Sequence, residues 1–345
     1  MRAVTIAPGK KGSLELSTIA EPARGKDEVL VRTLAVGVCG TDRELIGGRY
    51  GEAPAGQGRL VIGHESLGRV VEAPAGSGFA KGDLVVGIVR HPDPEPCENC
   101  AAGEWDMCRN GRYTEHGIKG LDGFASQFFT IDKQMLVKIE QDLGFVGVLL
   151  EPATVLAKAW EHIEHIGRRA SWAPRRVLIT GAGPVGLMGA LMGVQRGLEV
   201  HLQDHNRNEP KPALAKRLGA AYHTGRPRLE FDVEIECSGA PEAIAEMLEA
   251  ATPDRVVCLT GLSPGGHAST LRIAPLNQQM VLGNQAVFGS VNANRRHYEA
   301  AAQVLQRADK NFLEAMITRK IPLKSWRDAY EKRKGDVKTV LVFED

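Results

Sequence analysis

Residues 177–190 read VLITGAGPVGLMGA, and this stretch decides the fold. The residues VLIT predict a strand, and glycines follow it at once in a G-x-G-x-x-G spacing. In such a loop the first glycine allows a tight turn, the second lets the backbone approach a pyrophosphate, and the third lets the next helix pack on the strand. The amide hydrogens at the start of that helix attract phosphate groups. We therefore predict a dinucleotide-binding loop that contains Gly181, Gly183, Pro184, Val185 and Gly186.

Segments with strand and helix patterns alternate from about Arg176 onward. LEVHLQD, DVEIECSG and RVVCLTG read as strands, and KPALAKRLGA and PEAIAEMLEAA read as helices between them. This alternation predicts a doubly wound parallel sheet with helices on both faces, an α/β fold. Before about Glu151 the chain shows short strands broken by glycines, which predict an antiparallel, barrel-like domain. A chain of 345 residues is long enough for about two such domains.

The strand after the glycine-rich loop ends at Asp204, 18 residues after Gly186. An acidic residue at this point accepts hydrogen bonds from the ribose hydroxyls of the cofactor and repels a 2′-phosphate. A turn cap is the alternative role for this carboxylate. His205 and Arg207 follow directly and carry the charge that a 2′-phosphate needs. We predict that NAD is favoured and that NADP remains possible.

The composition excludes several classes of partner. The 43 basic and 42 acidic residues leave a net charge of +1, which gives no reason to expect binding to nucleic acid or to an anionic membrane. The start MRAVTIAPGKKGSLEL alternates like a strand, so we expect no signal peptide, and the most apolar runs are short of the roughly 20 residues that span a bilayer. Six cysteines with three in one cluster fit a metal site in a reducing cytosol better than disulfides. We expect a cytoplasmic protein.

Two sets of residues have the chemistry of zinc ligands. Cys39, His64 and Glu151 supply one thiolate, one imidazole and one carboxylate, and three protein ligands with a fourth position open are typical of catalytic zinc. Taken singly, each of these residues would read as an ordinary core or surface residue. A second set, Cys97, Cys100 and Cys108, has the C-x2-C-x7-C spacing.

The segments CGTD, GHESLGRVV, GDLVV, EPATV and GAGPVG, with the cysteine cluster, resemble the zinc-dependent medium-chain dehydrogenases over essentially the whole chain. The resemblance implies a partly open, GroES-like β-barrel catalytic domain at residues 1–153 and 291–345, with a Rossmann domain at 154–290. It implies a catalytic zinc ion on Cys39 and His64, with Glu65 beside them as an exchanging ligand or supporting residue. Glu151 resembles the glutamate that polyol and sugar dehydrogenases of the family carry as a ligand.

By the same resemblance, the cysteine cluster is the family's structural zinc lobe. The lobe usually has four cysteines, and Pro94 stands where the first is expected. We predict Asp93 as the fourth ligand. Other candidates from the neighbouring sequence are His91, Glu95, Glu115 and His116, and a lobe without metal is a further alternative.

The segments TEHGIKGLDGF and FGSVNANRRHY resemble the glucose (aldose) 1-dehydrogenases within this family. The resemblance implies that Glu115 and Asn292 contact the sugar and that Glu151 lies at the substrate; polar surface loops are the alternative for Glu115 and Asn292. Thr41, two residues after Cys39, is placed to accept the substrate proton, and a local turn hydrogen bond is its alternative role. Glu44 occupies the position where many relatives continue the proton relay with a histidine. The predicted reaction is NAD(P)-dependent oxidation of the C1 hydroxyl of an aldose to the lactone by hydride transfer. The alternatives are a polyol dehydrogenase of sorbitol or xylitol type and a zinc-less, non-catalytic relative. We expect a homodimer or homotetramer.

Overall fold

The computed structural model describes residues 1–250, 252–263, 265 and 269–343, and it divides into two compact units. The first unit comprises Met1–Glu151 and Ala293–Asp345, and the inserted unit comprises Pro152–Asn292. Each of the two junctions lies two residues from the position predicted by sequence.

The inserted unit is built on an all-parallel sheet with strand order β14-β13-β12-β15-β16-β17. Counted along the chain, this order is 3-2-1-4-5-6, the order of the Rossmann fold, which confirms the predicted doubly wound sheet. Its strands are β12 (Arg176–Thr180), β13 (Glu199–Gln203), β14 (Ala221–His223), β15 (Val233–Glu236), β16 (Val256–Leu259) and β17 (Ala286–Gly289). Its helices are α4 (Pro184–Gln195), α5 (Lys211–Leu218), α6 (Pro241–Leu248) and α7 (Ile273–Leu282), and α3 (Leu150–Gly167) begins at the junction.

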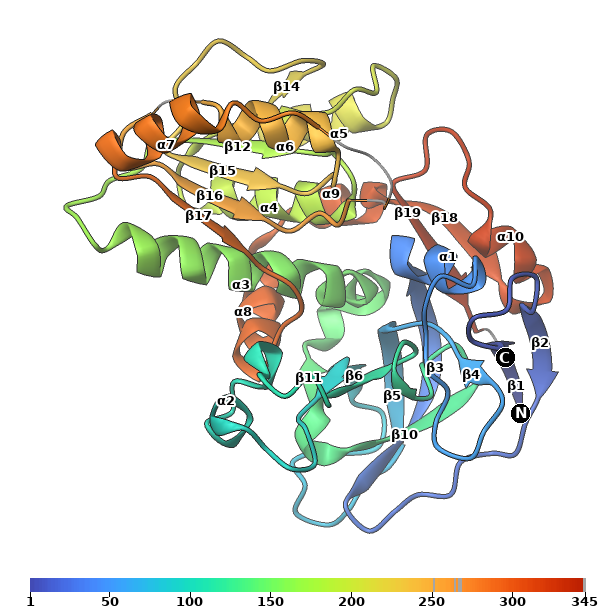
Figure 1. The fold of residues 1–345 in the computed structure, drawn as a ribbon. Coiled ribbons are helices and arrows are strands. Elements are labelled where there is room, and N and C mark those ends of the chain that lie inside the picture. The colour runs from blue at the N-terminus through green and yellow to red at the C-terminus, as the bar shows by residue number, and fades with distance from the viewer. Residues whose placement is uncertain (251, 264, 266–268, 344–345) are drawn as a thin grey trace. The chain divides into compact units, whose positions relative to one another are not determined.

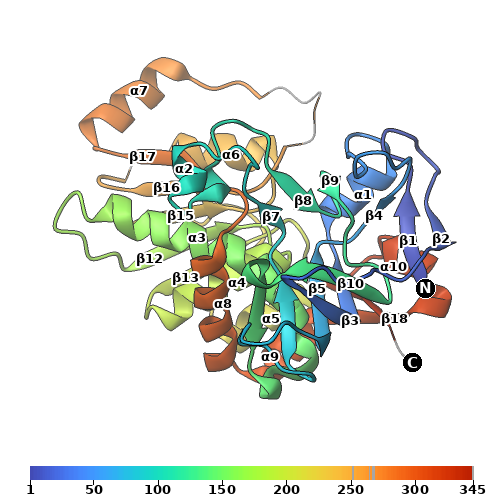
Figure 2. The same ribbon diagram turned by 90° about the horizontal axis from the view of Figure 1, so that it is seen from below.

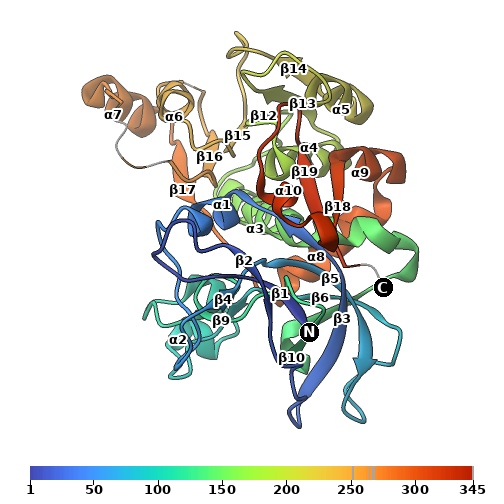
Figure 3. The same cartoon turned by 90° about the vertical axis from the view of Figure 1, so that its right-hand side faces the viewer.

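Buried aliphatic side chains form the interior of the inserted unit. Val177, Leu178 and Ile179 of β12 are fully buried, as expected for a parallel strand that is covered on both faces. By contrast, α7 has no buried residue and projects from the edge of the unit next to β17 (Figures 2 and 3).

The first unit contains a larger, mainly antiparallel sheet with strand order β11-β6-β5-β3-β19-β18, to which β10 adds by pairing with β3. Two smaller sheets have the orders β2-β1-β4 and β7-β8-β9. The strands are β1 (Arg2–Ile6), β2 (Glu15–Thr18), β3 (Glu28–Val38), β4 (Leu60–Val61), β5 (Glu65–Glu72), β6 (Leu84–Gly87), β7 (Arg90–His91), β8 (Thr114–His116), β9 (Gly120–Leu121), β10 (Phe128–Asp132), β11 (Leu136–Ile139), β18 (Ile317–Pro322) and β19 (Lys338–Val342). The α-helices are α1 (Gly40–Ile46), α2 (Glu98–Ala101), α8 (Arg295–Arg307), α9 (Lys310–Met316) and α10 (Arg327–Tyr330), and the 3-10 helices are η1 (Trp105–Met107), η2 (Lys133–Met135), η3 (Gln141–Leu149) and η4 (Leu323–Ser325).

The long strand β3 organises this sheet. Its first half pairs with β10, its second half pairs with β19 on the same edge, and β5 pairs along the other edge. The C-terminal strands β18 and β19, red in Figure 1, therefore complete the sheet that the N-terminal strands begin.

One helical stretch, Gln141–Gly167, is long and apolar enough to cross a membrane by length and composition alone. The apolar runs are thus longer than we predicted from the sequence. Because 78% of its most apolar window is buried inside the protein, the stretch has the character of a core helix.

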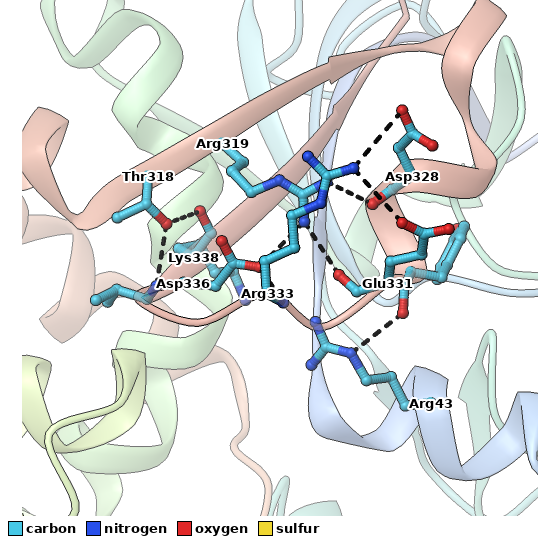
Figure 4. A network of polar contacts seen from close by, with 10 residues as sticks. Arg43, Thr318, Arg319, Asp328, Glu331, Arg333, Asp336 and Lys338 are labelled. Atoms are coloured by element: carbon cyan, nitrogen blue, oxygen red, sulfur yellow. Dashed lines mark hydrogen bonds and ion pairs between the residues drawn. The ribbon is translucent and has the colours of Figure 1, made fainter. Parts of the chain in front are cut away.

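A network of polar contacts holds the loop between α10 and β19 (Figure 4). The guanidinium of Arg319, on β18, donates to Asp336 Oδ2 at 3.0 Å and to the carbonyl oxygens of Glu331 and Asp328 at 3.0 and 2.6 Å. Thr318 Oγ1 accepts from Val337 N at 3.0 Å and donates to the carbonyl oxygen of Lys338 at 3.2 Å. These contacts fix where β19 begins, and with it the position of Lys338.

We predict that Arg319→Met lowers the free energy of unfolding by about 2 kcal/mol, because the poorly exposed Asp336 loses its guanidinium partner. The matched control is Arg333→Met, whose side chain is 53% exposed and whose loss should cost less than about 1 kcal/mol. Calorimetric melting of both variants checks this, and equal losses would contradict the assignment.

Candidate active site

The pairing of β3 with β5 brings together three residues with metal-ligand chemistry. Gly37 of β3 pairs with Glu65 of β5, Cys39 directly follows β3, and His64 directly precedes β5. One ligand atom from each of Cys39, His64 and Glu65 lies within 4.8 Å of the others. The structure thus brings together three of the four residues predicted for the catalytic zinc.

Asp42, which we did not predict from the sequence, orients two members of this group. One carboxylate oxygen accepts a hydrogen bond from Cys39 N at 2.8 Å, and the other lies 3.5 Å from His64 Nδ1. Burial disfavours the charged forms of both side chains, but their mutual attraction prevails, lowering the pKa of Asp42 and raising that of His64 well above its ordinary value. The His64 ring also interacts with the Cys39 thiol. A carboxylate behind a histidine fixes the ring as a metal site requires.

Glu65 is paired with a lysine from the far end of the chain. Lys338 Nζ contacts Glu65 Oε2 and also donates to the carbonyl oxygen of Val38 at 3.3 Å. A Cβ at Gly37 would overlap the Glu65 carboxylate, so the glycine leaves the room that this ion pair occupies. The carboxylate of Glu65 therefore lies between a buried ammonium and the Cys39–His64 pair.

Glu151 and Thr41 lie in the same region. Burial raises the pKa of Glu151 to about 7, and the side chain also interacts electrostatically with His64 and Glu65. Among the described residues, the ligand atoms that lie within 4.8 Å of one another here belong to Cys39, His64 and Glu65. The Glu151 carboxylate is not part of that group. Thr41 hydrogen bonds with Tyr50, whose pKa is raised to about 12 by burial. Tyr50 is a second neighbour of the group that we did not predict.

The donors of this group fit a zinc ion. Thiolate, imidazole and carboxylate are the side chains that zinc prefers, and a set of three leaves a position for a water or substrate oxygen. Protons compete with metal for such ligands, so we expect metal binding to weaken as the pH falls.

The cysteine loop, residues 97–108, forms a separate group. The Sγ atoms of Cys97, Cys100 and Cys108 lie within 4.8 Å of one another, and all six cysteines of the chain are free. The backbone N–H groups of Arg109 and Cys100 donate to Cys97 and lower the pKa of its thiol to about 6. Because such hydrogen bonds favour the thiolate, this loop also fits a metal ion.

Asp93 does not join these cysteines as we predicted. Its carboxylate accepts hydrogen bonds from Glu95 N at 2.9 Å, from Asn110 Nδ2 at 2.8 Å and from Arg112 Nε at 3.2 Å. Its backbone N–H, rather than its carboxylate, interacts with the thiol of Cys100. Among the described residues, the cluster contains only the three cysteines. The carboxylate shapes the turn before the loop, a role that the spacing of cysteines does not reveal.

The glycine-rich loop connects β12 to α4. Gly181 adopts a φ of +88°, a conformation that favours glycine. A Cβ at Gly186 would overlap the carbonyl oxygen of Gly181, whereas a Cβ at Gly183 would meet no atom within 4 Å. Gly183 is the N-cap of α4 and Pro184 is its first residue. The start of this helix is thus bordered by open space that can receive a pyrophosphate.

The Asp204 carboxylate makes more contacts within the protein than we predicted. Its Oδ2 accepts from Ala182 N at 2.7 Å and pairs with Lys211 Nζ at 2.7 Å, and its Oδ1 accepts from Asn206 N at 2.8 Å. Burial disfavours the charged carboxylate, but the Lys211 ammonium and these N–H groups lower the pKa of Asp204. The residue therefore ties the glycine-rich loop to the end of β13, as in the turn-cap alternative. His205 and Arg207 are exposed beside it.

A second buried carboxylate near this loop escaped the sequence reasoning. Glu236, at the end of β15, is fully buried and accepts hydrogen bonds from Thr180 Oγ1, Ser238 and Gly239 N. It joins the end of β12 to the segment that follows β15, where the strand order of the sheet reverses. Ligands of doubly wound sheets bind at this kind of position.

The two residues predicted to contact a sugar lie in different units. Glu115 is buried in the first unit and its Oε1 accepts from Arg90 Nε at 3.0 Å. Asn292, at the end of the inserted unit, has a φ of +61°, which is uncommon for a residue other than glycine. Lys158 Nζ donates to the carbonyl oxygen of the preceding residue, Val291, at 3.1 Å and so supports this turn.

Comparisons with known proteins agree with this arrangement. Residues 144–343 match the family model "Glucose dehydrogenase C-terminus", and residues 25–141 match "Alcohol dehydrogenase GroES-like domain". The chain is 38% identical to a glucose 1-dehydrogenase of Methanocella arvoryzae and 39% identical to glucose 1-dehydrogenase 2 of Vulcanisaeta moutnovskia, with 99% of each chain covered. It superposes on the Haloferax mediterranei glucose dehydrogenase in complex with NADP, Zn and gluconolactone with a TM-score of 0.91, 31% identity and full coverage of both chains.

We predict that Cys39→Ser and Cys100→Ser each remove about one zinc ion per chain, measured by mass spectrometry of dialysed protein. Cys100→Ser should also lower the melting temperature, because a metal bound only by the folded state adds its binding energy to folding. A zinc content that Cys100→Ser leaves unchanged would show that the cysteine loop binds no metal.

A second prediction concerns the glycine-rich loop. Gly186→Ala should cost about 1–3 kcal/mol of stability, because its Cβ has no room. Gly183→Ala should change stability by less than about 1 kcal/mol yet weaken binding of reduced dinucleotide about tenfold, because the added methyl group enters the space of the pyrophosphate. Fluorescence titration and calorimetry test the pair, and tight dinucleotide binding by Gly183→Ala would refute this placement.

Proposed function

Because the chain belongs to the zinc-dependent medium-chain dehydrogenases, in their glucose 1-dehydrogenase branch, we propose that it oxidises the C1 hydroxyl of a glucose- or galactose-type aldose to the lactone. NAD(P) is the hydride acceptor. The observation that carries the proposal is the Cys39–His64–Glu65 group on the GroES-like unit, in a chain whose inserted unit has the Rossmann strand order.

In this proposal Cys39 and His64 hold the catalytic zinc ion, and Glu65 and Glu151 are its carboxylate neighbours. Bound zinc would polarise the substrate hydroxyl and increase its acidity, while hydride passes to the nicotinamide. Asp42 keeps the His64 ring and the Cys39 backbone in place. Lys338 holds the Glu65 carboxylate and offsets its charge, so that the net negative charge near the metal stays low.

Thr41 accepts the proton of the substrate hydroxyl in this proposal. Its hydrogen bond with Tyr50 gives the proton a route onward, since Glu44 replaces the histidine that many relatives have. Glu115 and Asn292 bind the remaining hydroxyl groups of the sugar, with Glu151 beside the reacting carbon. Carboxylate and amide groups suit this task because they reject analogues that lack a hydroxyl partner.

For the cofactor, Gly181, Gly183, Pro184, Val185 and Gly186 surround the pyrophosphate in our proposal, and Asp204 lies near the adenosine ribose. The preference for NAD stays a prediction. The Lys211 ammonium offsets the charge of Asp204, and His205 and Arg207 are exposed beside it, so a 2′-phosphate can also be accepted. The Haloferax mediterranei enzyme was solved with NADP.

We also propose that the protein is cytoplasmic and assembles as a homodimer or homotetramer. The edge strand β17 and the exposed apolar residues of α7 support association of the inserted units. Ile273, Val281 and Leu282 are 65%, 65% and 74% exposed, a pattern more typical of an interface than of a free surface.

We predict good activity with glucose or galactose, weaker activity with sorbitol, and poor activity with ethanol, which lacks the hydroxyl groups that Glu115 and Asn292 would bind. Steady-state assays of aldoses and polyols with both cofactors, together with identification of the lactone product, test this. Faster oxidation of sorbitol than of any aldose would favour the polyol dehydrogenase alternative.

A separate prediction concerns the 2′-phosphate. Arg207→Ala should raise the KM for NADP about three- to tenfold, because one cation near the phosphate is lost, and should leave the KM for NAD within twofold. NAD serves as the internal control in this assay. Equal effects on the two cofactors would show that Arg207 does not meet the phosphate.

A further inference from the structure

Arg90 and Glu115 face each other across the pairing of β7 and β8. The register of these antiparallel strands sets Arg90 opposite Glu115, and opposite residues project to the same face. Arg90 Nε donates to Glu115 Oε1 at 3.0 Å, and the two residues are only 6% and 8% exposed. The carboxylate proposed to bind the sugar is thus held by a buried cation.

Two further contacts fix the guanidinium of Arg90. Its Nη1 donates to the carbonyl oxygen of Asp106 at 3.2 Å, and its central carbon lies 3.7 Å from the centroid of the Tyr113 ring. A planar guanidinium can make an ion pair, a carbonyl hydrogen bond and a stacking contact together, whereas a lysine ammonium cannot. Asp106 lies in η1, within the cysteine loop. Arg90 therefore connects Glu115 to that loop.

The cysteine loop is itself attached to the first turns of α8. Arg296 makes two hydrogen bonds to the carboxylate of Glu104, at 2.7 and 3.0 Å. Asn294 Nδ2 donates to Asp106 Oδ1 at 2.7 Å. Asp106, whose carbonyl oxygen accepts from Arg90, is therefore also held through its side chain, so the loop gives Arg90 a fixed point of attachment.

We propose that Arg90 is a positioning residue for sugar recognition, which fixes the orientation of Glu115 and links it to the cysteine loop. The inference rests on the proposed function, in which Glu115 binds sugar hydroxyls. A carboxylate already held in its binding orientation loses less conformational freedom when the sugar binds, so its hydrogen bonds contribute more to affinity. Arg90 acts through Glu115, and its loss should therefore affect sugar binding much more than turnover.

The test compares Arg90→Gln, Arg90→Lys, Glu115→Gln and the double variant Arg90→Gln/Glu115→Gln. Arg296→Gln is the comparison variant, because it removes the hydrogen bonds that another arginine makes to Glu104 in the same loop. The measurements are kcat and KM for glucose and a series of deoxyglucoses, KM for the cofactor, zinc content and melting temperature.

We expect Arg90→Gln and Glu115→Gln each to raise the KM for glucose about tenfold, with kcat changed less than threefold. The double variant should raise the KM for glucose little more than either single variant does, because both substitutions break the same Arg90–Glu115 ion pair. Arg90→Lys should lie between wild type and Arg90→Gln. Both single variants should also lose discrimination against the same deoxyglucose. Arg296→Gln should lower the melting temperature while its KM stays within twofold of wild type.

Additive effects of Arg90→Gln and Glu115→Gln would overturn the proposal, as would a KM for Arg296→Gln raised as much as that for Arg90→Gln. If Arg90→Gln does not fold, Arg90→Lys and Glu115→Gln still test the proposal. An unchanged KM for glucose and an unchanged deoxyglucose profile in both variants would refute it. If the wild-type enzyme oxidises glucose and Glu115→Gln leaves the KM for glucose unchanged, this inference fails while the proposed oxidation of an aldose stands. A wild-type enzyme that oxidises no aldose would end the proposed function itself.

Discussion

The position of β3 between β5 and β19 is the constraint on which the candidate active site depends. Gly37 pairs with Glu65 on one side and with Val340 on the other, so residues that follow β3 enter a space bordered by the starts of both neighbouring strands. For this reason Cys39 and His64 are neighbours in space, although they lie in different segments of the chain. The helix α1, which starts directly after Cys39, then supplies the carboxylate that holds them.

Asp42, His64, Glu65 and Lys338 form two complementary pairs of buried charges at this site. Asp42 faces His64, and Glu65 faces Lys338, so no buried charge of this set lacks a partner of opposite sign. An isolated buried charge would cost several kcal/mol, and pairing makes the group tolerable inside the protein. The same pairs serve the proposed chemistry, because a histidine oriented by a carboxylate and a glutamate held by a lysine present their remaining atoms in fixed directions. Arg90 and Glu115 repeat this principle at the proposed sugar contact.

The sequence predicted features that depend on local spacing. The glycine-rich loop and the alternating strands and helices follow from short motifs whose geometry is set by the neighbouring backbone. The Cys–His–Glu set was predicted from the chemistry of its side chains and from the family resemblance, and its assembly depends on the pairing of β3 with β5. The sequence did not predict Lys338, which meets Val38 across 300 residues and depends on strand register. Asp93 as the fourth ligand stays a prediction, although in this structure its backbone N–H, rather than its carboxylate, interacts with the thiol of Cys100. The contacts of the Asp204 carboxylate with Lys211 and with a backbone N–H of the glycine-rich loop were not predicted, because these groups reach it only in the folded unit.

The central claim is that Cys39 and His64 hold a zinc ion at which an aldose is oxidised, while a second ion lies in the cysteine loop. Anomalous diffraction at the zinc edge, from crystals grown with zinc and an aldonolactone, tests this most directly. We predict one peak in contact with Cys39 and His64 and another among Cys97, Cys100 and Cys108, with the lactone carbonyl next to the first. A zinc peak only in the cysteine loop, or a lactone bound away from Cys39 and His64, would contradict it.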